Sequence, residues 1–272
     1  MTDKDLWTSR SIEVWKIRTF GLRYDCANCT GDVMTNRRRG SRSATSKRLA
    51  KARTAIMRRR KGRTVLRPAD ASDEDLLAWH QASCSWPNLY YSSTIPYLRA
   101  IGAKRVAEVG VAYGYHAESI LTGVLGISYV GVDPYLAGYD DSDGFARDVA
   151  QLFMDDPQSS MNRLYAAVKS GLSNRYSGRA QIIRAGSREA AHEFPDSCFD
   201  AVFIDGDHRF ESVLHDLHAW WPKIRPGGSI LGDDYLRDSV AAAWEEFLSK
   251  VDGDSFFLEN HVSGYRTVVA VK

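Results

Sequence analysis

The sequence predicts an α/β fold with a doubly wound, mostly parallel Rossmann-like sheet. The apolar run of residues 199–204 stops abruptly at Asp205, and a second run stops at Asp233. Short apolar runs bounded by Gly and Asp are typical of strands that are buried on both faces of a parallel sheet. The segment between residues 105 and 125 adds a third observation, because it combines an apolar run, closely spaced glycines and an amphipathic pattern.

Acidic side chains follow both of the runs that stop at aspartate. Asp205 and Asp207 come after the first run, and Asp233 and Asp234 come after the second. Because ligands bind outside the carboxyl ends of strands in open α/β sheets, we expect all four side chains in one cleft. Crowded carboxylates repel one another, and clusters of oxygen ligands suit a hard cation such as Mg²⁺. The alternative is that these acids only cap helices and turns.

The upstream segment predicts a strand, a tight turn and a helix. Residues 105–109 fit the strand, residues 110–114 the turn and residues 115–125 the helix, a unit that presents backbone N–H groups to a ligand. The next predicted strand, residues 127–132, ends at Asp133. An acid in this place can accept hydrogen bonds from ribose hydroxyls, although it can also simply start a turn before proline.

The glycine spacing distinguishes two kinds of nucleotide site. A dinucleotide fingerprint needs G-x-G-x-x-G, but Ala112 and Tyr115 occupy its second and third glycine positions. The pattern present is Glu108-x-Gly110-x-x-x-Gly114. With Asp133 and the acids at the later strand ends, this pattern resembles the class I S-adenosylmethionine-dependent methyltransferases.

A narrower resemblance rests on four motifs in order. They are residues 204–208 (Ile-Asp-Gly-Asp-His), 220–222 (Trp-Trp-Pro), 226–228 (Pro-Gly-Gly) and 233–235 (Asp-Asp-Tyr). Together they look like the metal-dependent O-methyltransferases related to macrocin O-methyltransferase, and the resemblance covers roughly residues 100–272. It implies seven strands, the last of them antiparallel.

The resemblance also implies roles for particular residues. Those expected around the cofactor are Glu108, Gly110 and Gly114 at the methionine part, Asp133 at the ribose, and Gly186 and Ser187 at the adenine. Asp205, Asp233 and Asp234 match the metal positions, for Mg²⁺ or another divalent cation. Asp205 and His208 are the catalytic candidates, with His208 as a base. The expected reaction is S-adenosylmethionine-dependent, metal-assisted methylation of a hydroxyl on a small molecule.

The charge of the chain is divided very unevenly. Residues 1–68 hold 19 of the 36 basic residues but only five of the 34 acidic ones. Residues 37–67 contain 14 basic residues and no acid, and they have too few large apolar side chains to fold alone. We therefore expect a basic, partly disordered extension over residues 1–70 and a methyltransferase domain over residues 71–272.

The basic extension leaves other functions open. It could contact nucleic acid, which would make the protein a nucleic-acid methyltransferase, or direct nuclear localisation, or remain a solvated arm. A non-catalytic cofactor-binding interaction module and a hydroxylase-like relative are the further alternatives.

The remaining composition predicts a soluble intracellular protein, cytoplasmic or nuclear, that does not bind membranes. Cys26 and Cys29 form a C-x-x-C pair, but no second pair or nearby histidine completes a zinc site, so reduced thiols are expected. The sequence has no apolar run of the roughly 18–20 residues that would span a bilayer. The first residues do not resemble a secretory signal.

Overall fold

The computed structural model describes residues 70–83, 92–139, 144–259 and 266–272. The basic segment of residues 37–67 and the pair Cys26 and Cys29 lie outside these ranges. The division of the chain at residue 70 stays a prediction. Within the described ranges, no helix is both long and apolar enough to cross a membrane.

The described residues contain a seven-stranded sheet, as predicted. Its strands are β1 (Arg105–Val109), β2 (Ser128–Val132), β3 (Ala180–Ile183), β4 (Phe199–Ile204), β5 (Ile224–Gly232), β6 (Ser255–Glu259) and β7 (Arg266–Val271). The spatial order is β3-β2-β1-β4-β5-β7-β6. The first five strands in this row pair in parallel, whereas β7 is antiparallel to both β5 and β6. The α/β fold and the antiparallel last strand are therefore confirmed.

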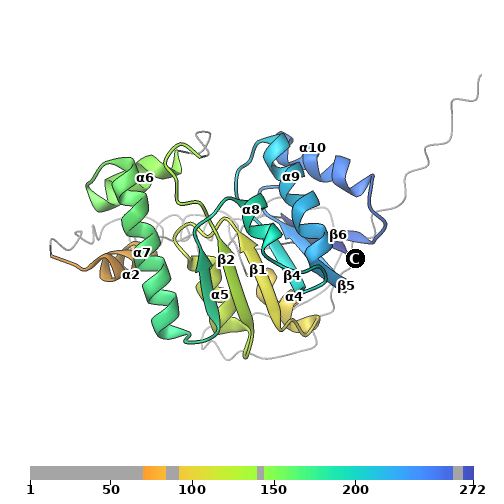
Figure 1. Ribbon diagram of the computed structural model, residues 1–272, viewed down its shortest axis with the longest axis horizontal. Helices are drawn as coiled ribbons and strands as arrows, with labels where there is room; N and C mark the ends of the chain where they lie inside the picture. Colours follow the sequence, from red (N-terminus) through yellow and green to blue (C-terminus); the bar gives the residue numbers. More distant parts are fainter. Residues whose placement is uncertain (1–69, 84–91, 140–143, 260–265) are drawn as a thin grey trace, which may run out of the picture. The chain divides into compact units, whose positions relative to one another are not determined.

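Two helices precede β1, and the others lie in the connections from β1 to β6 (Figure 1). They are α2 (Asp73–Ser83), α4 (Thr94–Ala100), α5 (Tyr115–Gly123), α6 (Phe145–Phe153), α7 (Pro157–Arg175), α8 (Ser187–His192), α9 (Phe210–Trp220) and α10 (Asp238–Leu248), with a short 3₁₀ turn at Trp221–Lys223. The helix α6 ends at Phe153, and α7 begins at Pro157. The Asp156 carboxylate accepts a hydrogen bond from Ser159 N at 3.0 Å, and Pro157 takes the first helical position.

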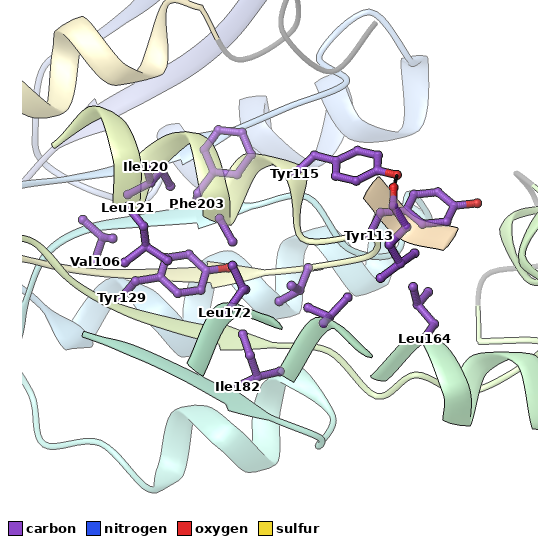
Figure 2. Packing of buried hydrophobic residues seen from close by; sticks show 14 of the residues in the cluster. Val106, Tyr113, Tyr115, Ile120, Leu121, Tyr129, Leu164, Leu172, Ile182 and Phe203 are labelled. Atoms are coloured by element: carbon purple, nitrogen blue, oxygen red, sulfur yellow. Dashed lines mark hydrogen bonds between the residues drawn. The ribbon is translucent and has the colours of Figure 1, made fainter. Parts of the chain in front are cut away.

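Two hydrophobic clusters cover the two faces of the sheet, which makes the fold doubly wound. One cluster joins the sheet to α2, α4, α5, α6 and α7, and the other joins it to α8, α9 and α10. Figure 2 shows part of the first cluster, where side chains of β1 to β4 meet those of α5 and α7. Tyr129 on β2 is 1% exposed and lies within this cluster although it carries a hydroxyl group.

Backbone hydrogen bonds hold the carboxyl ends of five strands in one row. Gly110 N donates to Val132 O at 2.9 Å, and Asp133 N donates to Ile183 O at 3.1 Å. On the other side of β1, Asp205 N donates to Val109 O at 2.8 Å, and Asp233 N donates to Ile204 O at 3.2 Å. The residues that follow β1, β2, β4 and β5 therefore share one edge, as the apolar runs predicted.

The contact between α10 and β5 depends on a residue without a side chain. A Cβ atom on Gly232 would lie 2.5 Å from the indole ring of Trp244, which is fully buried. We expect Gly232→Ala to lower the free energy of unfolding by about 1–3 kcal/mol through overpacking, measured by urea denaturation.

Gly171→Ala is the matched control for this prediction. Its added Cβ atom would come no closer than 3.6 Å to the Arg175 side chain. Because alanine favours helix over glycine, this variant should be as stable as the parent or more stable by about 0.5–1 kcal/mol. Equal stability of both variants would contradict the packing argument.

Candidate functional site

The order of the sheet points to the carboxyl ends of β1 and β4 as the place for a ligand. The strands β2 and β3 lie on one side of β1, and β4 lies on the other. In open α/β sheets this reversal of direction opens a crevice between the loops that follow the two central strands. The loops concerned begin at Gly110 and Asp205.

The turn after β1 can approach β4 only because Gly110 has no side chain. Gly110 has a φ of 90°, and a Cβ atom on it would lie 1.8 Å from Asp205 O. Gly114 has a φ of 75° and directly precedes α5. Both predicted glycines therefore occupy backbone conformations that favour glycine, and the turn brings the N-terminus of α5 to the cleft.

Asp133 holds this turn in place through its carboxylate. Oδ2 accepts hydrogen bonds from Val111 N and Ala112 N, both at 3.0 Å, and Oδ1 accepts one from Tyr135 N at 2.7 Å. Asp133 is 8% exposed. Burial raises its pKa, while the three backbone hydrogen bonds act in the opposite direction. The residue predicted to hold a ribose thus also connects the loops after β1 and β2.

Glu108 points into the protein rather than along the turn. It is 1% exposed, Oε1 lies 2.8 Å from Nδ1 of His116, and Oε2 accepts a short hydrogen bond from the Tyr129 hydroxyl. Burial and the charge of Glu108 raise the pKa of Tyr129 well above its ordinary value. The Glu108 carboxylate therefore ties β1 to β2 and to the first turn of α5.

Gly186 and Ser187 begin α8 directly after β3, with Gly186 at the N-cap. Ser187 is 4% exposed, and its hydroxyl oxygen accepts a hydrogen bond from Trp220 Nε1 at 2.9 Å. The Ser187 hydroxyl also bonds to Asp216 on α9. Ser187, which is predicted to lie beside the adenine, is thus held by two hydrogen bonds to residues of α9.

His208 and Asp234 meet at the ends of β4 and β5. Nε2 of His208 lies 2.8 Å from Oδ2 of Asp234, and Nε of Arg237 lies 2.9 Å from the same oxygen. Burial acts to raise the pKa of Asp234, but the bonds and charges of His208 and Arg237 outweigh it and lower the pKa. The backbone of Asp234 has a φ of 53°, a region in which aspartate is enriched.

Asp233 has a different environment from its neighbour. Burial first, and then the negative charge of Asp234, raise the pKa of Asp233 to about 6. The pKa values of the two carboxylates are therefore shifted in opposite directions. Asp234 is held ionised between two basic side chains, whereas Asp233 gains a proton in mildly acidic solution.

Asp207 is buried and stabilises the start of α9. Its carboxylate accepts hydrogen bonds from Arg209 N at 2.9 Å and from the Ser212 hydroxyl at 2.7 Å, and it also binds the Arg209 guanidinium. Burial acts to raise the pKa of Asp207, but these partners lower it. Asp207 thus binds the chain just before and within the first turn of α9, and the expectation that all four acids face one cleft stays a prediction.

The donor types at this edge are those that a hard cation prefers. Oxygen ligands from Asp205, Asp233 and Asp234 are of the right kind for Mg²⁺. Within the described residues, however, no three or more His, Cys, Asp or Glu side chains form a group that could hold a metal ion. Oδ2 of Asp234 is already bonded to His208 and Arg237.

Several residues of the site are not evident from the sequence. His116, Tyr129 and Arg237 lie in segments where the pattern indicates only helix, core strand or turn. Asp216 could have been found from the sequence. It interrupts the apolar stripe that Val213, Leu217 and Trp220 form on α9. An acid among buried helical positions is a recognisable anomaly.

Comparison with known proteins identifies a domain and a fold. Residues 107–235 match the family model described as a methyltransferase domain. The uncharacterised protein y4gI of Sinorhizobium fredii (strain NBRC 101917 / NGR234) is 23% identical over 153 residues, which cover 54% of this chain and 15% of that protein. The uncharacterised protein R132 of Acanthamoeba polyphaga mimivirus is 42% identical over 36 residues, 13% of this chain and 16% of that protein. The chain thus spans less than a fifth of either relative.

Solved structures share the fold at low identity. A Staphylococcus aureus protein assigned as a caffeoyl-CoA O-methyltransferase aligns with a TM-score of 0.50 and 13% identity. The alignment covers 82% of this chain and 100% of that one. The SAH-bound methyltransferase PaMTH1 of Podospora anserina aligns with a TM-score of 0.49 and 14% identity, over 89% of this chain and 100% of that one. At 13% identity the first likeness establishes the fold alone.

Replacing Asp133 by asparagine tests its role in holding the turn. An amide has an N–H₂ group where one carboxylate oxygen stood, so at least one donor would face another donor. We expect Asp133→Asn to lower the free energy of unfolding by about 1–3 kcal/mol, measured by urea denaturation. The exposed Asp252→Asn should stay within about 0.5 kcal/mol of the parent. If both variants are equally stable, Asp133 does not hold the turn.

Proposed function

We propose that this chain, a S-adenosylmethionine-dependent methyltransferase by its domain match and its fold, methylates a hydroxyl oxygen of a small molecule. The observation that carries the proposal is the pair of His208 and Asp234, 2.8 Å apart, in the loops that follow β4 and β5. A hydroxyl becomes a strong nucleophile only when its proton is removed. A histidine oriented by a carboxylate is suited to remove it.

The geometry assigns a direction to this proton transfer. Asp234 accepts a hydrogen bond from Nε2 of His208, so in the neutral imidazole the lone pair lies on Nδ1. We infer that Nδ1 would take the hydroxyl proton as the hydroxyl oxygen receives the methyl group. The cofactor, when bound, supplies the electrophilic methyl group on its sulfonium. Asp234 stabilises the imidazolium that results, and the proton then passes to solvent.

The residues around the turn are proposed to hold the cofactor. Gly110 and Gly114 would let the methionine part approach the backbone, and Gly186 and Ser187 would border the adenine. A carboxylate has about four acceptor sites, and Asp133 uses three of them for backbone amides, so it keeps capacity for a ribose hydroxyl. Glu108 would contribute indirectly, because its bonds to His116 and Tyr129 position the strand that leads into the turn.

The charge of the catalytic part favours a small acceptor over a nucleic acid. Outside residues 1–68 the chain has 29 of its 34 acidic residues. A polyanion would be repelled by this excess unless the basic segment of residues 37–67 bound it first. A small hydroxyl compound needs no such help.

A divalent cation that assists the reaction is the second candidate, in keeping with the resemblance to the macrocin O-methyltransferase relatives. The adjacent carboxylates of Asp233 and Asp234 favour it, since the second raises the pKa of the first. Asp205, Asp233 and Asp234 would hold the ion, which would lower the pKa of an acceptor hydroxyl. Arg237 would first have to leave Asp234.

His208→Gln is expected to lower turnover by about 10²- to 10⁴-fold, the usual contribution of a positioned base. Methyl-labelled S-adenosylmethionine and a panel of phenols and sugar alcohols would measure turnover. Calorimetry with S-adenosylhomocysteine should show unchanged affinity, because the proposed cofactor contacts lie on other loops. The exposed His192→Gln is the matched control. Full turnover by His208→Gln would remove this residue from the mechanism.

Excess chelator distinguishes the two candidates. We expect turnover to persist, because His208 can remove the proton and Arg237 already compensates the charge of Asp234. Loss of turnover that Mg²⁺ restores would instead establish the cation-assisted reaction. In that case, Asp233→Asn should abolish the restoration while S-adenosylhomocysteine still binds.

A further inference from the structure

Asp216 is a buried acid that the proposed reaction does not use. It lies on α9 and is 7% exposed. Buried carboxyl groups are uncommon, and those without an opposite charge nearby usually have several hydrogen bonds. Among the described residues, the hydrogen-bonding partner of Asp216 is Ser187.

The direction of the hydrogen bonds shows how much of the carboxyl group is used. Trp220 Nε1 is only a donor, so the Ser187 oxygen must accept at 2.9 Å. The single hydroxyl proton of Ser187 is then left for Asp216. One acceptor site of the carboxyl group is therefore occupied, and the rest of its capacity has no partner within the described part of the chain.

The surroundings of Asp216 place it at the cofactor edge of the sheet. Ser187 follows β3, and a Cβ atom on Gly206, just after β4, would lie 3.7 Å from Oδ2 of Asp216. Tyr139, which follows β2, is close enough for the charge of Asp216 to act on its hydroxyl. The carboxyl group thus lies beneath the loops after β3 and β4, where the proposed function puts the adenine.

The charges around Asp216 partly cancel. Burial raises its pKa to about 7, the Ser187 hydrogen bond lowers it, Asp207 raises it and Arg188 lowers it. His215 on the same helix is bonded to Arg188, with 2.9 Å between Nη2 and Nδ1. A bound base would exclude the remaining water and favour the neutral acid further.

We propose that Asp216 contacts the nucleobase of the bound cofactor, with its neutral carboxyl group donating a hydrogen bond to a ring nitrogen of adenine. This proposal rests on the proposed function and adds to it a residue that determines base recognition. Asparagine has the same shape and keeps an N–H donor at every pH. Leucine fills a similar volume but has no donor.

The test is calorimetry with S-adenosylhomocysteine at pH 6, 7 and 8 on the full chain. The affinity of the parent should fall about fivefold between pH 7 and pH 8, because only the protonated acid binds. Asp216→Asn should bind at pH 6 like the parent and lose the pH dependence. Asp216→Leu should bind at least tenfold more weakly at pH 6. The exposed Glu211→Gln on the same helix is the matched control and should behave like the parent.

The outcomes separate this inference from the function on which it rests. If neither the parent nor Glu211→Gln binds S-adenosylhomocysteine at any pH, the proposed function is wrong. If both bind and Asp216→Leu binds equally well, the contact with the base is wrong. The same holds if Asp216→Asn keeps the pH dependence of the parent, because another group would then be titrating. Thermal unfolding without ligand shows whether each variant is folded.

Discussion

The carboxylate of Asp133 is the interaction on which the geometry of the site depends. Two of the three amides that it accepts belong to Ala112 and Tyr135, which have φ angles of 49° and 45°. Such left-handed conformations are unfavourable for residues with a Cβ atom and persist only where the surroundings impose them. The Tyr135 hydroxyl also donates to Ala112 O at 3.0 Å. Together these bonds keep the turn after β1 against the loop after β2, and Gly110 against Asp205.

The acids at this edge of the sheet divide into structural and chemical groups. Asp133 and Asp207 bind backbone amides, and Glu108 binds a histidine and a tyrosine, so all three are used to hold the scaffold. Asp233 and Asp234 remain close to each other, and Asp234 faces a histidine. The carboxylates look alike in the sequence. In the structure some of them bind the scaffold, and one faces a histidine. The fold fixes the loops with some of its acids and places another, Asp234, against His208.

Charge compensation explains why so many carboxylates can share one edge. Arg209 binds Asp207, and Arg237 and His208 bind Asp234. Asp216 and Asp233 have no bonded arginine or lysine among the described residues, and burial raises the pKa of each, to about 7 and about 6. Asp207 and Asp234 therefore have cationic partners, whereas Asp216 and Asp233 become neutral more easily than an exposed acid.

The sequence alone determined the strands, the order of the main motifs and the edge at which they meet. Apolar runs, glycine turns and helical periodicity are local properties, and the parallel sheet then brings Gly110, Asp133, Asp205 and Asp233 together at the strand ends. The orientation of each side chain was decided only by the tertiary structure. Asp133 binds the amides of Val111 and Ala112, and Glu108 turns inward to Tyr129, because partners distant in the sequence supply the hydrogen bonds. The orientation of a carboxylate is set by the strongest hydrogen-bond donors around it. A local sequence motif does not contain the positions of those donors.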